Sequence, residues 1–216
     1  MFAQDRDLVV YEPRLFLDVV WLGQRLASES GQVISSVAVA SGASFVSLGI
    51  MPGQIVNYDD ASYEIVQVLG ATQLGISRPR ASTSDPVVPT PDSALTTFTI
   101  YTFAHQLAIV HGQILRMLGI EPDVVAQPGE TVITESNILN PGALVRLEAL
   151  GALHLIFSAA SASGVAGDGG GFAERAAMYR ERFIAERSRV SVLIDADGDG
   201  KAEATRRPSV MHFVRG

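Results

Sequence analysis

The sequence contains no cysteine, which excludes disulfide bonds, thiolate nucleophiles, iron–sulfur clusters and zinc ribbons. The fold must be held by packing alone, and 216 residues are enough for one or two domains with a buried core. Charged residues are scarce as well, at 18% of the chain against 47% hydrophobic residues, and the mean hydropathy is positive. A soluble monomer ordinarily carries more charge than this. We therefore expect contacts between subunits to cover part of the surface.

The chain also lacks the patterns of a secreted or membrane protein. Its first residues, MFAQDRDLVVYEP, contain no basic stretch followed by an apolar run. The most apolar later segment, residues 149–160, is too short to cross a bilayer and carries His154. We expect neither secretion nor a membrane anchor, and an intracellular site of assembly agrees with the missing cysteines.

Positive charge is in the minority, since the formal net charge is −7 and the isoelectric point lies near 5.0. Long-range attraction to phosphate is then absent, so the surface as a whole does not favour nucleic-acid binding. The densest basic stretch holds Arg180, Arg182, Arg187 and Arg189, with Glu174, Glu181 and Glu186 interleaved. This mixture favours a solvated or intersubunit salt-bridging helix face over a DNA contact.

The first half of the chain changes from a helical to a strand period. Apolar residues recur every three or four positions from Leu15 to Leu26 and predict an amphipathic helix over residues 13–28. After Gly31 the period becomes two, and we expect strands at residues 33–39, 45–48, 54–58, 63–69, 73–77 and 96–102. Residues 78–95 hold four prolines among Ser and Thr, which predicts an exposed, extended loop.

The second half is helical by pattern. Apolar residues from Phe103 to Met117 mark a helix that ends at Gly119. Asn140 and Pro141 predict the start of the next helix, with the asparagine as its cap, and this helix is apolar nearly all round over residues 144–160. A glycine-rich run ends it, and a charged helix follows over residues 172–189. The two would form a hairpin whose core and interface hold Leu144, Leu147, Leu150, Leu153, Phe157, Phe172, Tyr179 and Phe183.

Together these elements predict an α+β fold: a helical core with a long helical hairpin, an inserted small antiparallel β-barrel or sandwich, and a C-terminal β-hairpin. The helical core would comprise residues 1–30 and 103–189, the β-module residues 31–102, and the C-terminal hairpin and tail residues 190–216. An apolar hairpin must be enclosed, so we expect residues 140–189 to be completed by identical copies or by a partner.

The sharpest chemical motif lies in the C-terminal hairpin. Asp195, Asp197 and Asp199 alternate with small residues in DADGDG, which matches the first six positions of a calcium loop. The match then fails, because Arg206 stands where a bidentate glutamate belongs and a strand precedes the motif. A β-turn rich in Asp and Gly is the favoured interpretation, since both residues tolerate positive φ. A weak calcium site is the alternative.

No pattern predicts catalysis or a bound cofactor. His105 and His111 lie six residues apart on one helix and point to different sides, so they do not ligate one metal. His154 is expected to be a hydrogen-bonded core or interface residue, and His212 has no partner by spacing. The sequence has no Gly-x-Ser-x-Gly motif, and residues 167–171 lack the Gly-Lys-Ser/Thr ending of a phosphate loop. We expect a protein that is not an enzyme.

Three segments of the second half together resemble the head-to-tail adaptor (connector) proteins of tailed phages. They are the apolar helix LVRLEALGALHLIFSAAS, the charged helix AERAAMYRERFIAERSR and the strand region VSVLIDADGDGKAEATRR. The strand segments FVSLGIMPGQIVNY and YEIVQVLGATQLGIS are similar to a small β-module of phage structural proteins. A β-module of this size is larger than the minimal all-helical adaptor, which leaves its role open.

The resemblance implies a cyclic homo-oligomer, a dodecamer by family, that sits below the portal protein in the neck of the virion. The ring would extend the DNA channel without sequence-specific binding, contact the next tail or neck protein, and assemble in the host cytoplasm. In the family the hairpin forms the ring wall and the C-terminal tail reaches the portal, which in this chain implies Val210, Met211, His212 and Phe213.

Two other functions compete with this one. The protein would act as a binding module of a phage tail or baseplate if the β-module used Tyr58, Tyr63 and neighbouring loops to hold a partner. An enzyme with an unrecognised site is the third, and no constellation of residues favours it.

Overall fold

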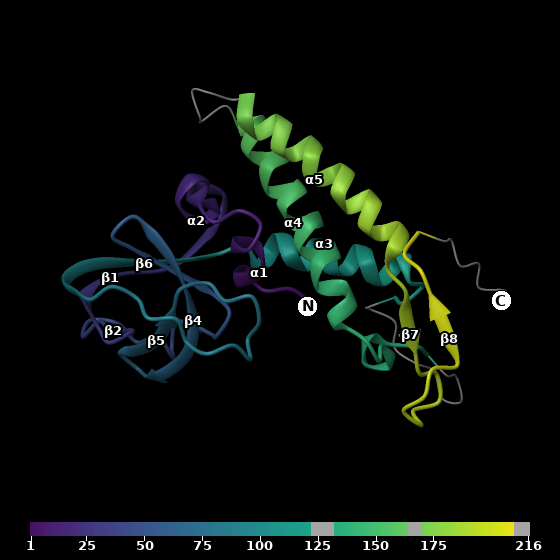
Figure 1. Cartoon of the computed structure of the whole chain (residues 1–216), viewed down its shortest axis with the longest axis horizontal. Coiled ribbons are helices and arrows are strands. Elements are labelled where there is room, and N and C mark those ends of the chain that lie inside the picture. Colours follow the sequence, from purple (N-terminus) through teal and green to yellow (C-terminus); the bar gives the residue numbers. More distant parts are fainter. Residues whose placement is uncertain (122–131, 164–169, 210–216) are drawn as a thin grey trace. The chain divides into compact units, whose positions relative to one another are not determined.

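A computed structural model describes residues 1–121, 132–163 and 170–209 of the chain (Figure 1). The chain divides into two compact units. One comprises Gln4–Ala104 and contains the strands β1 to β6, and the other comprises Met1–Ala3 and His105–Gly216 and contains the long helices. The prediction of a mixed α and β fold with a small antiparallel barrel is confirmed.

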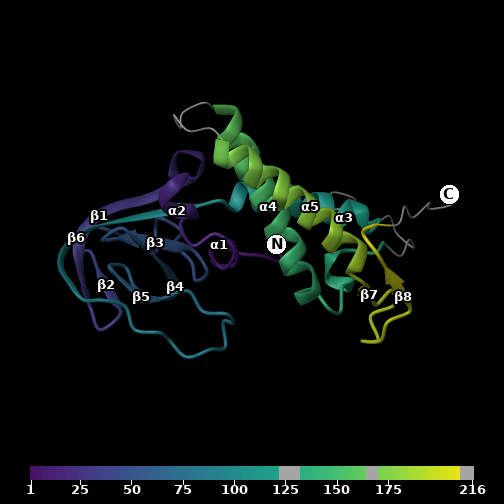
Figure 2. The same cartoon turned by 45° about the horizontal axis from the view of Figure 1, so that its top comes forward.

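Six antiparallel strands close into a barrel in the order β1-β2-β5-β4-β3-β6, and Figure 2 shows them curling round a common interior. Their bounds are Gln24–Ile34 (β1), Val37–Val39 (β2), Ile55–Tyr58 (β3), Ala61–Gly70 (β4), Gln73–Ser77 (β5) and Ser93–Thr102 (β6). Alternate side chains point inward, as in β6, where Phe98 and Ile100 are buried between the more exposed Thr97, Thr99 and Tyr101. Closure leaves no free edge in the barrel.

Two of the barrel's hairpins turn through pairs of left-handed residues. Ser35 and Ser36 have φ of 50° and 62° between β1 and β2, and Asp59 and Asp60 have φ of 46° and 57° between β3 and β4. Two-residue loops with positive φ match the right-handed twist of the strands they join. Asp tolerates this conformation better than most residues because its short side chain bonds locally.

The helix predicted over residues 13–28 is wrong. Short turns occupy this region, α1 (Asp5–Val9), α2 (Leu15–Asp18) and the 3₁₀ turn η1 (Val20–Leu22), and β1 begins at Gln24. Gln4–Ala104 thus forms one unit, whereas the prediction assigned residues 1–30 to the helical core. The cause is non-local: β1 pairs with β6 from Gln24 to Val33, and a backbone engaged in that ladder is not available for a helix.

The strand predicted over residues 45–48 is also wrong. Its backbone follows turns, in which the Leu48 N–H donates to the Ser44 carbonyl and the Gly49 N–H to the Val46 carbonyl. Phe45 is fully buried in the barrel core, so the apolar residue that suggested a strand fills the interior from a loop. The single strand predicted over residues 33–39 is wrong as well, because Ser35 and Ser36 form the turn between β1 and β2 inside it. The remaining predicted strands, residues 54–58, 63–69, 73–77 and 96–102, lie within a few residues of β3 to β6.

The second unit begins with α3 (Ala104–Met117), whose predicted apolar stripe is buried at Leu107, Val110 and Ile114. Gly119 has φ of 67°, and the Ile120 N–H donates to the Leu115 carbonyl, which is the hydrogen bond of a Schellman C-cap. After the short turn η2 (Glu135–Asn137) come α4 (Gly142–Ser163) and α5 (Gly170–Arg189). These two helices pack along each other, so the predicted hairpin is confirmed in part, and residues 164–169 lie outside the described residues.

The chain ends in a small sheet of β7 (Val192–Ile194) and β8 (Ala204–Arg206). The sequence predicted that the Asn140 side chain caps α4, and this prediction is wrong. The Asn140 amide instead donates to the Ser191 carbonyl at 3.0 Å and accepts from the Leu193 N–H at 2.8 Å. The asparagine therefore joins the start of α4 to β7, and a backbone bridge between Ile138 and Ile194 extends this junction.

Among the described residues α4 alone is long and apolar enough to cross a membrane. Length and composition of one helix are weak evidence, because the core helix of a globular unit meets the same criteria. In this chain 61% of its most apolar window is buried inside the protein, and α4 is a core helix of the second unit.

Candidate functional site

The apolar side of the hairpin lies inside a single chain. Leu144, Leu147, Leu150, Leu153 and Phe157 are all buried, each at 1% exposure or less. They form the hairpin core as predicted. The expectation that these α4 side chains need neighbouring copies to cover them is wrong, because the chain's own helices already do so.

Two contacts show how α4 is covered. The Phe157 ring stacks between those of Phe172 and Tyr179 of α5, with centroids 5.9 and 5.7 Å away. A Cβ on Gly151 would lie 2.6 Å from Val110 of α3 and 3.0 Å from the Phe183 ring of α5. The helix is therefore sandwiched between α3 and α5, and glycine permits the close approach.

The outer face of α5 is the part of the hairpin that remains open. Phe172 and Phe183, which pack against α4, are half-buried, whereas Ile184 is 47% exposed. Arg180, Glu181, Arg182 and Arg189 are exposed along the same helix. An ion pair of 3.1 Å joins Glu186 to Arg146 of α4, so part of the predicted salt bridging occurs within one chain. The face combines small, apolar and oppositely charged side chains.

A polar cluster that the sequence did not predict interrupts the apolar core of the second unit. Glu148, fully buried in α4, accepts from the Phe2 N–H at 3.0 Å and contacts His111 Nδ1 at 3.1 Å. His111 Nε2 lies 3.0 Å from Glu135. Burial raises the pKa of Glu148, and the hydrogen bonds from Phe2 and His111 oppose that rise. A glutamate in a mostly apolar helix was the signal that would have revealed the cluster.

The geometry of this cluster does not assemble a hydrolase. A cleft of about 510 Å³ is lined by Phe2, Glu135, Ser136, Ile138 and Pro141. Ser136 is the hydroxyl in it, but it hydrogen-bonds to the Thr134 hydroxyl at 2.8 Å and not to His111. A serine nucleophile needs a hydrogen bond to its base. Ser136 and the pair of Glu148 and His111 therefore do not form a serine–histidine–carboxylate arrangement among the described residues.

The acidic turn between β7 and β8 gathers four carboxylates. The ligand oxygens of Asp195, Asp197, Asp199 and Glu203 all lie within 4.8 Å of one another, so this group meets the distance requirement for a metal site. Glu203 was missed by the sequence reasoning, which looked for a glutamate three residues later. Oxygen donors at these spacings suit calcium better than a transition metal.

The same turn also closes without an ion. Asp195 accepts from the Gly198 N–H at 2.6 Å and the Gly200 N–H at 2.9 Å, which lowers its pKa. The Lys201 ammonium lies 2.9 Å from Asp199 and supplies a positive charge at the cluster. Both interpretations of the sequence, a turn and a weak calcium site, therefore stay open.

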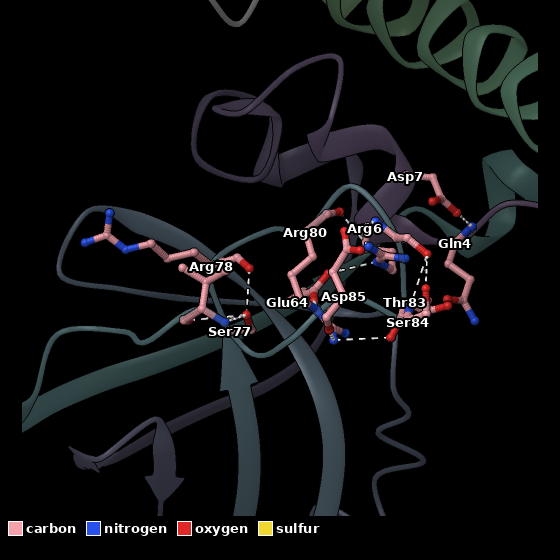
Figure 3. A network of polar contacts seen from close by, with 12 residues as sticks. Gln4, Arg6, Asp7, Glu64, Ser77, Arg78, Arg80, Thr83, Ser84 and Asp85 are labelled. Carbon is pink, nitrogen blue, oxygen red and sulfur yellow. Dashed lines mark hydrogen bonds and ion pairs between the residues drawn. The ribbon is translucent and has the colours of Figure 1, made fainter.

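In the barrel unit a buried triad ties three segments together, and Figure 3 shows Arg6 and Arg80 converging on Glu64. The Arg6 guanidinium pairs with Glu64 at 2.8 Å and donates to the Arg80 carbonyl at 2.6 Å. Arg80 pairs with the other oxygen of Glu64 and donates to the Asp85 carbonyl at 2.6 Å. The triad fastens α1 and the proline-rich loop to β4, so its role is structural.

The remaining predicted residues do not gather into a site. Tyr58 and Tyr63, proposed as a binding surface, are buried and stacked with ring centroids 4.3 Å apart. Both rings belong to the barrel core and so offer little exposed surface to a partner, although Tyr58 also lines a cleft of the barrel unit. His154 Nδ1 contacts the Ala176 carbonyl at 3.1 Å, as expected of a hydrogen-bonded core histidine. Val210, Met211, His212 and Phe213 lie outside the described residues.

Comparisons with family models, with curated proteins and with solved structures find no match to this chain.

Proposed function

We propose that the chain is a structural virion protein, a head-to-tail adaptor that forms a ring below the portal of a tailed phage and extends its DNA channel. In this proposal the protein is not an enzyme, and it contacts identical copies, the portal protein and the next tail or neck protein. It has no specific DNA contact and no membrane partner. The support is the resemblance of the second half of the sequence to such adaptors, together with a surface suited to neighbouring copies.

The outer face of α5 is the observation that carries the proposal. Ala173, Ala177, Glu181, Ile184 and Ser188 recur at three- or four-residue spacing and are all exposed. The small side chains of Ala173, Ala177 and Ser188 let another helix approach closely, and Ile184 offers an apolar side chain between Ala177 and Ser188. The flanking Arg and Glu residues permit complementary ion pairs, because both signs of charge are present. Since α4 is covered within the chain, this face replaces the apolar core as the expected contact between copies.

A paired substitution tests the proposal against the binding-module alternative. Ile184→Glu places a charge on the α5 face, and Leu95→Glu places one on β6 of the barrel, where Leu95 is 83% exposed. Both sites are exposed, so both variants should fold. We expect Ile184→Glu to prevent assembly onto the portal protein of the same phage and Leu95→Glu to leave it intact. The reverse result would support a tail or baseplate protein that binds through its barrel.

A further inference from the structure

A cleft of about 280 Å³ lies on the outer face of the barrel, entirely within the Gln4–Ala104 unit. Its floor is formed by outward side chains of β6 and β3, where Asn57 is paired with Thr99 and Ile55 with Tyr101. The α2 and η1 turns form one wall, and the hairpin between β3 and β4 forms the end. The lining residues are Phe16, Leu17, Val20, Asn57, Tyr58, Asp59, Asp60, Thr97, Thr99 and Tyr101.

The charge of this cleft has one sign. Asp59 and Asp60 are its two charged lining residues, and no Lys, Arg or His lines it. Asp59 accepts one hydrogen bond, from the Thr96 hydroxyl at 2.8 Å. Asp60 is exposed, and its carboxylate has no hydrogen bond or ion pair with the residues that the structure describes. Arg14, on the neighbouring α2 turn, pairs with Asp18 instead. The residues that line the cleft therefore carry a net negative charge.

Asp59 and Asp60 are not the residues that a two-residue hairpin turn usually prefers. Both lie in the left-handed region, where an Asn-Gly pair is the preferred choice for a two-residue loop. Neither carboxylate forms an ion pair with the residues that the structure describes. A cation brought by a ligand would give both of them a partner.

The opposite wall is apolar. Leu17 and Val20 are half-buried and leave hydrocarbon facing the cleft, while Thr97, Thr99 and Tyr101 offer hydroxyl groups along the floor. A ligand that fits has an alkyl stem for the apolar wall and a cationic head for the carboxylates. Arginine and lysine side chains have this form, and they cover apolar surface with their stems while the charged head stays polar. The planar guanidinium also binds carboxylates in a bidentate manner.

We propose that this cleft binds an arginine side chain presented by a partner protein. The inference does not rest on the adaptor function, since it follows from the chemistry of the cleft alone. A phosphate or nucleic-acid ligand is disfavoured by the two carboxylates. A purely apolar ligand would not use the two carboxylates, which are exposed at the end of the cleft.

The test is a titration of the full chain with N-acetylarginine amide, followed by backbone amide chemical shifts. Citrulline in place of arginine is the probe control, because it keeps the shape of the side chain and removes its charge. Asp60→Asn removes one carboxylate, and asparagine tolerates the left-handed conformation at least as well as aspartate. Asp85→Asn is the matched variant outside the cleft, since its side chain still accepts from the Ser82 N–H.

We expect saturable shifts at Asp59, Asp60, Thr97 and Thr99 with the arginine probe and none with the citrulline probe. Asp60→Asn should weaken binding about fivefold, the factor expected for one partly exposed ion pair. Asp85→Asn should bind as the unmodified chain does. Absent shifts with arginine, equal shifts with citrulline, or an equal loss in both variants would overturn the proposal.

Discussion

His111 Nδ1 lies 3.1 Å from Glu148 in the middle of the most apolar helix of the chain. The carboxylate is fully buried, and it also accepts from the Phe2 N–H, which lies far away in the sequence. The pair thus joins the first residues, α3 and α4 through one acceptor. A buried acceptor with two donors is costly to remove, because each donor then loses its partner.

Glu148→Ala is therefore expected to lower the free energy of unfolding by about 1–3 kcal/mol, the cost of leaving buried donors unsatisfied. Arg146→Ala is the control on the same helix, since Arg146 is half-exposed and its ion pair lies at the surface. That control should cost about 0.5 kcal/mol or less. Urea unfolding of both variants measures the difference, and equal losses would show that Glu148 has no special role.

The buried Asp5 side chain should make the stability of the barrel unit depend on pH. Burial raises its pKa to about 7 from an ordinary value of 3.8, although the Phe103 N–H donates to it at 2.8 Å. The folded state then binds the proton more tightly than the unfolded state. Stability from this group is fully present below pH 3.8 and is lost as the pH rises through 7.

Between pH 5 and pH 8 this loss amounts to about 3 kcal/mol for a shift of this size. Asp5→Asn carries no titrating proton and keeps an oxygen for the Phe103 N–H, so its stability should vary less over the same range. Chemical denaturation of both proteins at the two pH values makes the comparison. Identical pH profiles would contradict the buried, protonated state of Asp5.

The buried triad of Arg6, Glu64 and Arg80 should respond differently to replacement of one member and of all three. We expect the single replacement to cost more stability than the triple one. Glu64 is 1% exposed and the two arginine side chains 6% and 9%, so removing one member leaves buried charge without a partner. Glu64→Ala should destabilise the barrel by about 3–5 kcal/mol. The triple variant Arg6→Met, Glu64→Leu, Arg80→Met should recover most of that loss, as measured by thermal unfolding. No recovery would mean that the charges themselves are required.

The elements that sequence patterns predicted well are those with strong local signals. α4 and α5 were expected from apolar spacing and from the Asn140 and Pro141 start, and β3 to β5 from alternation between turn residues. The left-handed turn at Asp59 and Asp60 lies between the strands predicted over residues 54–58 and 63–69. In each case the local preference and the final structure agree.

The errors arose where distant segments decide the structure. Residues 24–28 match a helical period, yet they form part of β1 because they pair with β6. Their own sequence contains no local signal for that pairing. Asn140 carries a cap signal, but its amide is taken by β7, more than fifty residues away. The cluster of His111 and Glu148 likewise joins residues that no spacing rule relates.

The acidic turn gives a prediction on metal binding. The interpretation as a turn without metal predicts no heat on calorimetric titration with calcium and no change in melting temperature. Asp195→Ala should loosen the turn with or without calcium, because two backbone N–H groups lose their acceptor. Binding heat that Asp197→Asn abolishes, while the fold stays intact, would establish a calcium site in place of the turn.

The adaptor proposal is tested most directly by the molar mass of the assemblies that the protein forms. Light scattering after size-exclusion chromatography should be measured on the protein alone and mixed with the portal protein of the same phage. The proposal predicts a ring in one of the two samples, with many copies of this chain bound to each portal assembly in the mixture. A chain that stays monomeric at all concentrations and elutes apart from the portal would contradict it.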